Sequence, residues 1–255
     1  MSEEKTLIID GSHGEGGGQI LRTALSLSSI LKRPIQIENI RRGRKIPGLL
    51  PQHLTSVRAA GQVSDAFLQG DRLGSTELLF QPGSLKSGKF SFNVAEERGS
   101  AGSVSLVLQT LFPPLSFSSI FSEVEITGGT HVRWSPPFHF LREVFLPVIR
   151  RLGFHIDIQL ERWGWYPQGG GRVKAKVFPG QRISSLQVIE KGRLLSLVGI
   201  SAVGNLPVGI AERQKTAAEK ILKRLPLDCP LTVDIVQAPG AGKGTVFLLV
   251  AEYEN

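Results

Sequence analysis

Cysteine is almost missing from this sequence: Cys229 is the only one among its 255 residues. A single cysteine excludes an internal disulfide, which suits a reducing compartment and predicts a cytoplasmic protein. The first residues also lack the basic and apolar pattern of a secretory signal peptide. One stretch without charge, 99–122, contains Pro113 and Pro114. We therefore expect a buried helix that ends before these prolines and then a loop, with no membrane-spanning helix.

Acidic residues are outnumbered, with 22 Asp and Glu against 30 Lys and Arg, which gives a net charge of +8 and a pI of about 9.9. This balance favours a polyanionic partner, either nucleic acid or a nucleotide. A basic soluble protein without such a ligand is the alternative on charge alone. Hydrophobic residues make up 41% and charged residues 20%, which excludes a disordered chain.

One pattern of residues occurs twice. A glycine-rich loop precedes a run with helical spacing at 19–31, and the small residues 99–103 precede a second run that we expect to end at 108–110. Arg22 and Gln109 occupy matching places, 87 residues apart. Pro47 and Pro136, 89 residues apart, each lead into a further helical run. Alternation of apolar and polar residues predicts strands at 90–94 and 123–127.

The repeat predicts an α+β fold in which a unit of two helices on a sheet is used twice. The expected repeat domain spans residues 1–180, with units at about 1–95 and 96–180. Residues 181–255 do not follow the repeat and predict a separate small α/β domain. Its expected elements are a helix at 210–225 and strands at 194–202, 231–236 and 245–252.

Two glycine-rich segments raise the question of a phosphate loop. Gly240–Thr245 lacks the order Gly-Lys-[Ser/Thr] and precedes a strand, so we expect a hairpin turn there. Residues 10–22, DGSHGEGGGQILR, follow a strand and precede a helix, so backbone N–H groups can converge on an anion. A close-packed strand–helix turn is the alternative. Glu15 favours a ligand loop, because a carboxylate there can hold a Mg²⁺ that accompanies phosphates, and Arg22 supplies the opposing charge.

A strongly basic segment, 40–48, carries four cations in five positions, Arg41 to Lys45. A solvated basic turn and a phosphate-binding site are both consistent with this pattern. Arginine offers paired donors that suit phosphate oxygens, and Gln52 and His53 follow as further donors.

Five strings resemble the RNA 3'-terminal phosphate cyclase family in content and order: GEGGGQILR, RRGRKIPGLLPQHL, GSAGSVSLVLQT, GGTHVRWSPP and GWYPQGGG. They cover essentially the whole chain. The resemblance implies three repeated helix-and-sheet units and one small inserted α/β domain. It also implies a reaction in which a histidine takes AMP from ATP and passes it to an RNA 3'-phosphate. The 2'-OH then displaces AMP and closes a 2',3'-cyclic phosphodiester.

The resemblance also implies roles for particular residues. Contacts to ATP are expected from Glu15, Arg22, Gln109 and Pro136, with Glu15 also toward Mg²⁺. Contacts to the RNA phosphate are expected from Arg41, Arg44, Gln52 and His53. Two positions depart from the family pattern: His131 stands where Asp or Asn is usual, and His139 where an acidic residue is usual.

The family's nucleophilic histidine belongs to a third repeat, and the sequence printed here shows two. None of the five histidines matches that motif, so the catalytic residue is unassigned. We expect self-association or a complementing fragment that supplies the third repeat. Three functions compete: the cyclase, a non-catalytic RNA-binding relative in RNA processing or ribosome biogenesis, and a small-molecule transferase. The basic segment fits the transferase less well.

Overall fold

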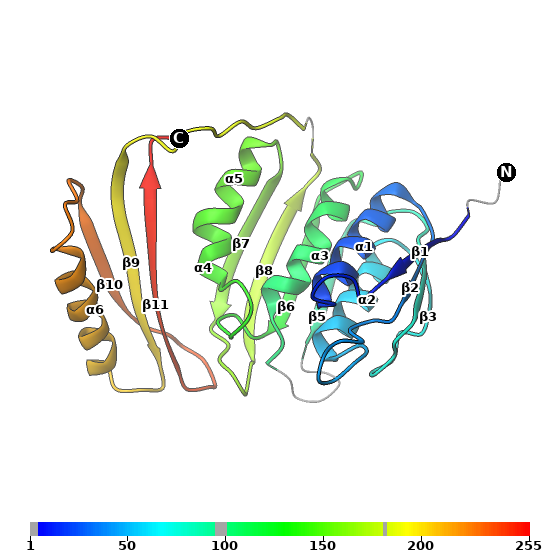
Figure 1. Cartoon of the computed structure of the whole chain (residues 1–255), viewed down its shortest axis with the longest axis horizontal. Helices are drawn as coiled ribbons and strands as arrows, with labels where there is room; N and C mark the ends of the chain where they lie inside the picture. Colours follow the sequence, from blue (N-terminus) through cyan, green and yellow to red (C-terminus); the bar gives the residue numbers. More distant parts are fainter. Residues whose placement is uncertain (1–4, 95–100, 181–182) are drawn as a thin grey trace.

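The computed structural model describes residues 5–94, 101–180 and 183–255, and it confirms an α+β fold. Three sheets lie side by side along the long axis, from the N-terminal sheet to the C-terminal one (Figure 1). No helix within the described ranges is both long enough and apolar enough to span a bilayer.

The first sheet has the strand order β1-β2-β4-β3, with β1 parallel to β2 and the other pairs antiparallel. Its elements follow the chain as β1 (Leu7–Asp10), α1 (Gly18–Leu31), β2 (Ile35–Glu38), α2 (Pro51–Val63), β3 (Phe67–Gln69) and β4 (Leu78–Gln81). Apolar side chains from α1, α2 and the sheet form one core that includes Leu25, Ile37 and Phe80, all fully buried.

The second sheet repeats this topology in the order β5-β6-β8-β7, again with the first pair parallel and the others antiparallel. Its strands are β5 (Lys89–Asn93), β6 (Ser122–Gly128), β7 (His155–Arg162) and β8 (Gly171–Phe178). Between them lie α3 (Val104–Ser116) and a continuous helical run made of α4 (Phe138–Phe140), the π-helix η1 (Leu141–Phe145) and α5 (Leu146–Arg151). The repeat that the sequence predicted is therefore present, with the same strand order in both copies.

The two units meet earlier in the chain than residue 95. The strand at 89–93 pairs with β6 in the second sheet, so it opens the second unit and does not close the first. Gly99 and Ser100, the start of the expected second small-residue loop, lie outside the described residues.

Helix α3 is longer than predicted, because Pro113 and Pro114 lie inside its last turn and do not end it. Proline lacks the N–H that would bond the carbonyl four residues earlier. The carbonyl that Pro114 leaves free, that of Thr110, accepts a hydrogen bond from Ser26 Oγ of α1 at 2.7 Å. The first unit thus satisfies a backbone group that the prolines expose, and the helix continues to Ser116.

The third sheet, β10-β9-β11, takes all its strands from the C-terminal residues: β9 (Leu194–Gly204), β10 (Leu231–Gln237) and β11 (Gly244–Tyr253), with α6 (Gly209–Leu222) between β9 and β10. Both β10 and β11 pair with β9, on opposite sides. The hairpin predicted at Gly240–Thr245 is therefore wrong: this segment crosses over the end of β9. Its glycines pack on the second unit, and a Cβ added at Gly244 would lie 2.2 Å from Trp165 Cε3.

This contact predicts a large stability difference between two glycine substitutions. Gly244→Ala should lower the free energy of unfolding by about 1–3 kcal/mol, because the added methyl group overpacks the Trp165 ring. Gly43→Ala is the matched control, since a Cβ there meets nothing within 4 Å. Urea unfolding followed by circular dichroism measures both variants. Equal stability of the two would contradict the close packing at Gly244.

Candidate functional site

The loop between β1 and α1 brings a helix N-terminus against side chains of the next helix. Gly14 and Gly16 have φ of +59° and +55°, values that favour glycine. Gly18 meets a different constraint, because a Cβ there would lie 2.3 Å from His53 Nε2 and 2.8 Å from Arg22 Nη1. The N-cap residue Gly17 supplies no side-chain cap to α1. Its first-turn N–H groups are therefore available to an anion.

Arg22 lies on the second turn of α1, is 7% exposed and lacks an acidic partner within the described part of the chain. Its Nη2 donates to Gln19 Oε1 at 3.0 Å, and its Nε has no hydrogen-bond partner. Burial lowers the pKa of Arg22 to about 10, so the guanidinium is charged at neutral pH. A buried cation with an unused donor is the arrangement that an incoming anion stabilises.

His53 occupies the first turn of α2, and its tautomer follows from one contact. The N–H of Leu50 donates to His53 Nδ1 at 3.2 Å, so the neutral ring carries its hydrogen on Nε2, which faces Gly18. Burial, followed by the charges of Arg41 and Arg22, lowers the pKa of His53 to about 3. At neutral pH the ring is an uncharged hydrogen-bond donor beside Arg22.

The basic segment forms a closed turn with its own internal bonds. Arg41 has φ +55°, and its Nη1 donates to the carbonyls of Ile46 and Gly48, each at 2.8 Å. Burial and the nearby charge of Arg44 lower the pKa of Arg41. Arg44 Nη2 forms an ion pair with Glu15 Oε2 at 3.1 Å, which ties this turn to the glycine loop.

Gln52 and Gln109 take part in contacts between elements. Gln52 Oε1 accepts a hydrogen bond from the N–H of Ser103 at 3.1 Å and so joins the two units. Gln109 and Arg22 both line a cleft of about 260 Å³ between α1, α3 and α5. Pro136 is not among the described residues that line this cleft. Its neighbour Pro137 lines a different cleft, beside the third sheet.

All the predicted site residues except Pro136 thus belong to one group. The charges of Arg22 and Arg41 both reach His53, and Arg44 acts on Arg41 and pairs with Glu15. Gln52 is the neighbour of His53, and Gln109 shares a cleft with Arg22. Glu15 is 91% exposed and pairs with Arg44. Within the described residues no group of three or more metal-ligating side chains occurs, so Glu15 does not belong to a protein metal cluster there.

Sequence reasoning named His131 and His139 separately and missed that they touch. His131 Nε2 lies 2.9 Å from His139 Nδ1, and Thr130 Oγ1 lies 2.8 Å from His131 Nδ1. The His131 ring stacks on Trp163 at 4.1 Å between centroids. Burial and the neighbouring ring lower the pKa of His131 to about 3, and burial and Arg142 lower that of His139 to about 4. Nothing in the spacing of these residues signals the contact, which arises where the loop with His131 approaches the short helix α4 with His139.

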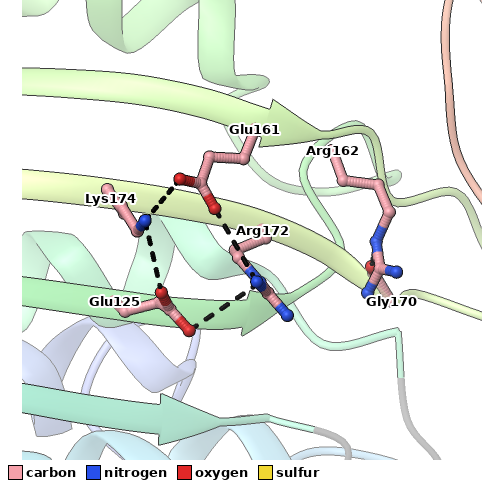
Figure 2. Close-up of polar contacts among 6 residues, drawn as sticks. All are labelled: Glu125, Glu161, Arg162, Gly170, Arg172 and Lys174. Atoms are coloured by element: carbon pink, nitrogen blue, oxygen red, sulfur yellow. Dashed lines mark hydrogen bonds and ion pairs between the residues drawn. The ribbon is translucent and has the colours of Figure 1, made fainter.

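The basic charge is not spread evenly over the surface. On the face of the second sheet that points away from the core, Lys174 and Arg172 alternate with Glu125 and Glu161 in an ion-pair network (Figure 2). The hydrogen bond that Lys174 donates to Glu161, followed by the charge of that carboxylate, raises the pKa of Lys174. Cations there are neutralised by protein carboxylates, whereas Arg22 and Arg41 are not.

The depressed pKa of His53 predicts a pH effect on stability. The unfolded chain takes up a proton at this ring near pH 6.5, and the folded chain takes one up only near pH 3. The unfolded state therefore binds more protons in this window, and stability is lost as pH falls from 6.5 toward 3. His53→Asn, whose side-chain oxygen can still accept from Leu50, should flatten this loss in part, since His131 and His139 continue to contribute. Unfolding midpoints at pH 7 and pH 4.5 measure the effect. An unchanged pH dependence in the variant would contradict a buried neutral His53.

Comparison with known proteins places this chain in a family. A family model described as RNA 3'-terminal phosphate cyclase matches residues 13–251. The protein named RNA 3'-terminal phosphate cyclase from Nostoc punctiforme is 45% identical over 250 residues, which cover 97% of this chain and 71% of that relative. Relatives of the same name from Pyrobaculum aerophilum and Staphylothermus marinus are 44% and 43% identical, over 97% and 96% of this chain and 70% and 69% of their own lengths. This chain belongs to the RNA 3'-terminal phosphate cyclase family.

Proposed function

We propose that this chain acts as an RNA 3'-terminal phosphate cyclase, converting an RNA 3'-phosphate into a 2',3'-cyclic phosphodiester and using ATP to do so. In this reaction AMP is transferred from ATP to the 3'-phosphate with loss of pyrophosphate. The vicinal 2'-OH then attacks the activated phosphorus and AMP leaves. Family membership supports the reaction, and none of the comparisons favours the non-catalytic alternative.

The observation that carries the proposal is the buried guanidinium of Arg22, which has an unused donor and no acidic partner among the described residues. A phosphate oxygen near Gly18 would accept from this guanidinium, from His53 Nε2 and from the first-turn N–H groups of α1. These donors are held in place before the ligand arrives, by the Leu50 bond and by Gln19. Such preorganisation favours charge that builds up on a reacting phosphate.

Two further features support an ATP site. Gln109 lines the same cleft as Arg22, so its amide is available to the nucleotide while Arg22 faces the phosphates. Mg²⁺ would enter with ATP and neutralise phosphate charge, with Glu15 as its protein contact. The position of Pro136 against adenine stays a prediction from the resemblance. A cytoplasmic location is part of this proposal and is supported by the single cysteine.

RNA recognition rests on the basic turn. Arg41 uses Nη1 within the turn, which leaves the rest of its guanidinium for a phosphate, and Arg44 reaches across to the glycine loop. His53 and the side-chain NH₂ of Gln52 lie on the adjoining first turn of α2. These four side chains offer hydrogen-bond donors to an RNA phosphate, between the N-terminus of α1 and the second unit.

Removal of Arg22 should abolish the response to nucleotide. ATP with Mg²⁺ at 100 times its Kd should stabilise the parent by about 2.7 kcal/mol, seen as a rise in melting temperature. Arg22→Gln should show little or no rise, whatever its own melting temperature, since loss of a buried unpaired charge can itself stabilise the fold. Arg33→Gln, an exposed cation after α1, is the control and should behave as the parent. An equal rise in both variants would argue against a phosphate at Arg22.

The reaction itself is tested with an RNA that carries a 3'-phosphate. ATP should convert its end to a phosphatase-resistant cyclic phosphate, and the RNA should bind in a salt-dependent manner. Arg41→Ala with Arg44→Ala should reduce the slope of log affinity against log salt by about 1.4, at about 0.7 per contact with a single strand. Lys89→Ala with Lys176→Ala removes the same charge elsewhere and is the control.

The assay is run with and without a fragment supplying the part of the relatives that this chain does not cover. Binding without conversion in both cases would support the non-catalytic alternative. If the slope of log affinity against log salt is the same for the two double variants, the basic turn does not contact the RNA.

A further inference from the structure

A second cleft, of about 550 Å³, lies between the second unit and the third sheet. His131 and Trp165, both buried, form part of its lining together with Arg133, Tyr166 and Lys243. None of its lining residues is among those proposed above for ATP or the 3'-phosphate, and Pro137 at its edge follows Pro136, the residue expected against adenine. Loops from all three units, including the β7–β8 turn and the β10–β11 crossover, lie along the same edge of the molecule, the lower edge in Figure 1.

The charges in this cleft are unpaired cations. Neither Arg133 nor Lys243 takes part in an ion pair within the described residues, and no Asp or Glu is among the residues that line the cleft. Lys174 and Arg172, on the far face of the second sheet, are instead paired with Glu125 and Glu161 (Figure 2). A cleft with free positive charge fits a polyanion.

Aromatic rings stand exposed beside these cations. Tyr166 is 73% exposed and Trp134, the neighbour of Arg133, is 98% exposed with φ +63°. A bulky residue is rarely found with positive φ, so the fold holds Trp134 outward against its backbone preference. Exposed aromatic rings next to free cations are the pattern by which proteins stack the bases of single-stranded nucleic acid.

Two hydrogen bonds close the turn that carries Tyr166. Gly169 N–H donates to the carbonyl of Trp165 at 2.7 Å, and Arg162 Nε donates to the carbonyl of Gly170 at 2.6 Å. Trp165 packs beneath the turn at 3% exposure. The turn therefore presents the Tyr166 ring at the surface, beside the cleft and within reach of a base.

Two hydrogen bonds between elements link the wall of this cleft to the phosphate site. Gln52, next to His53, accepts from the N–H of Ser103, and the N–H of Val104 donates to the carbonyl of Gly129 at 2.9 Å. Gly129 is followed directly by Thr130 and His131 in the cleft wall. These bonds fix the position of the cleft relative to His53.

We propose that this cleft binds the single-stranded nucleotides that precede the RNA 3' end. Tyr166 and Trp134 stack on bases, and Arg133 and Lys243 contact phosphates. The proposal rests on the proposed function, since it extends the same substrate away from the reacting end. With this cleft, the affinity for RNA increases with the length of the strand, which the 3'-phosphate site alone does not provide.

The test compares a 3'-phosphorylated dinucleotide with a 3'-phosphorylated decanucleotide of unstructured RNA, by fluorescence anisotropy at one salt concentration. The parent should bind the decanucleotide at least tenfold more tightly. Tyr166→Ala with Lys243→Gln should remove most of that advantage and leave dinucleotide affinity unchanged. Tyr166→Phe should keep it, because the ring is retained. Phe67→Ala with Lys89→Gln, an exposed ring and an exposed cation on other strands, is the matched control.

Each outcome decides one question. A length advantage that persists in the Tyr166 and Lys243 variant overturns the cleft proposal. Equal weakening of both RNAs also overturns it, since those residues would then serve the end itself. If the parent shows the length advantage and the variant loses it, but a 3'-hydroxyl RNA binds as well as a 3'-phosphate RNA, the cleft proposal holds and the phosphate site fails.

Discussion

The close approach of Gly18 to His53 and Arg22 is the constraint on which the candidate site depends. Only a residue without a Cβ lets the N-terminus of α1 reach these side chains, since an added carbon would overlap the imidazole ring. The contact aligns three kinds of donor on one point: backbone N–H groups, an uncharged Nε2–H and a buried guanidinium. The glycine loop therefore lowers local backbone stability and in return brings α1 and α2 within reach of one phosphate.

The twofold repeat explains how the rest of the molecule supports this point. Each unit has the strand order of the other, so α1 and α3 occupy equivalent places, and they pack directly on each other. Hydrogen bonds between the first unit and α3 therefore stabilise both units. Ser26 satisfies the carbonyl that Pro114 leaves free, and Gln52 holds the start of α3. The position of Gln109 relative to Arg22 follows from this packing.

The third sheet meets the second unit through glycines set against one tryptophan. Added Cβ atoms at Gly204, Gly242 and Gly244 would each fall close to Trp165. The segment that resembles a phosphate loop, Gly240–Thr245, thus uses its glycines for packing and not for an anion. The same tryptophan supports the turn of Tyr166, so the junction of the two parts also shapes the cleft between them.

The sequence by itself determined the repeat, the strands and helices within a few residues, and the glycine loop before α1, because these follow from local periodicity and backbone freedom. It also pointed to Arg22, Arg41, Arg44 and His53 through their motifs. Only the tertiary structure decided that α3 continues through two prolines, that β10 and β11 lie on opposite sides of β9, and that His131 touches His139. Those features depend on partners distant in the chain: a hydroxyl from α1, a strand paired with both neighbours, and Trp163, on which a loop and the short helix α4 meet. Local sequence patterns do not predict such contacts, because the contacts depend on how the elements pack together.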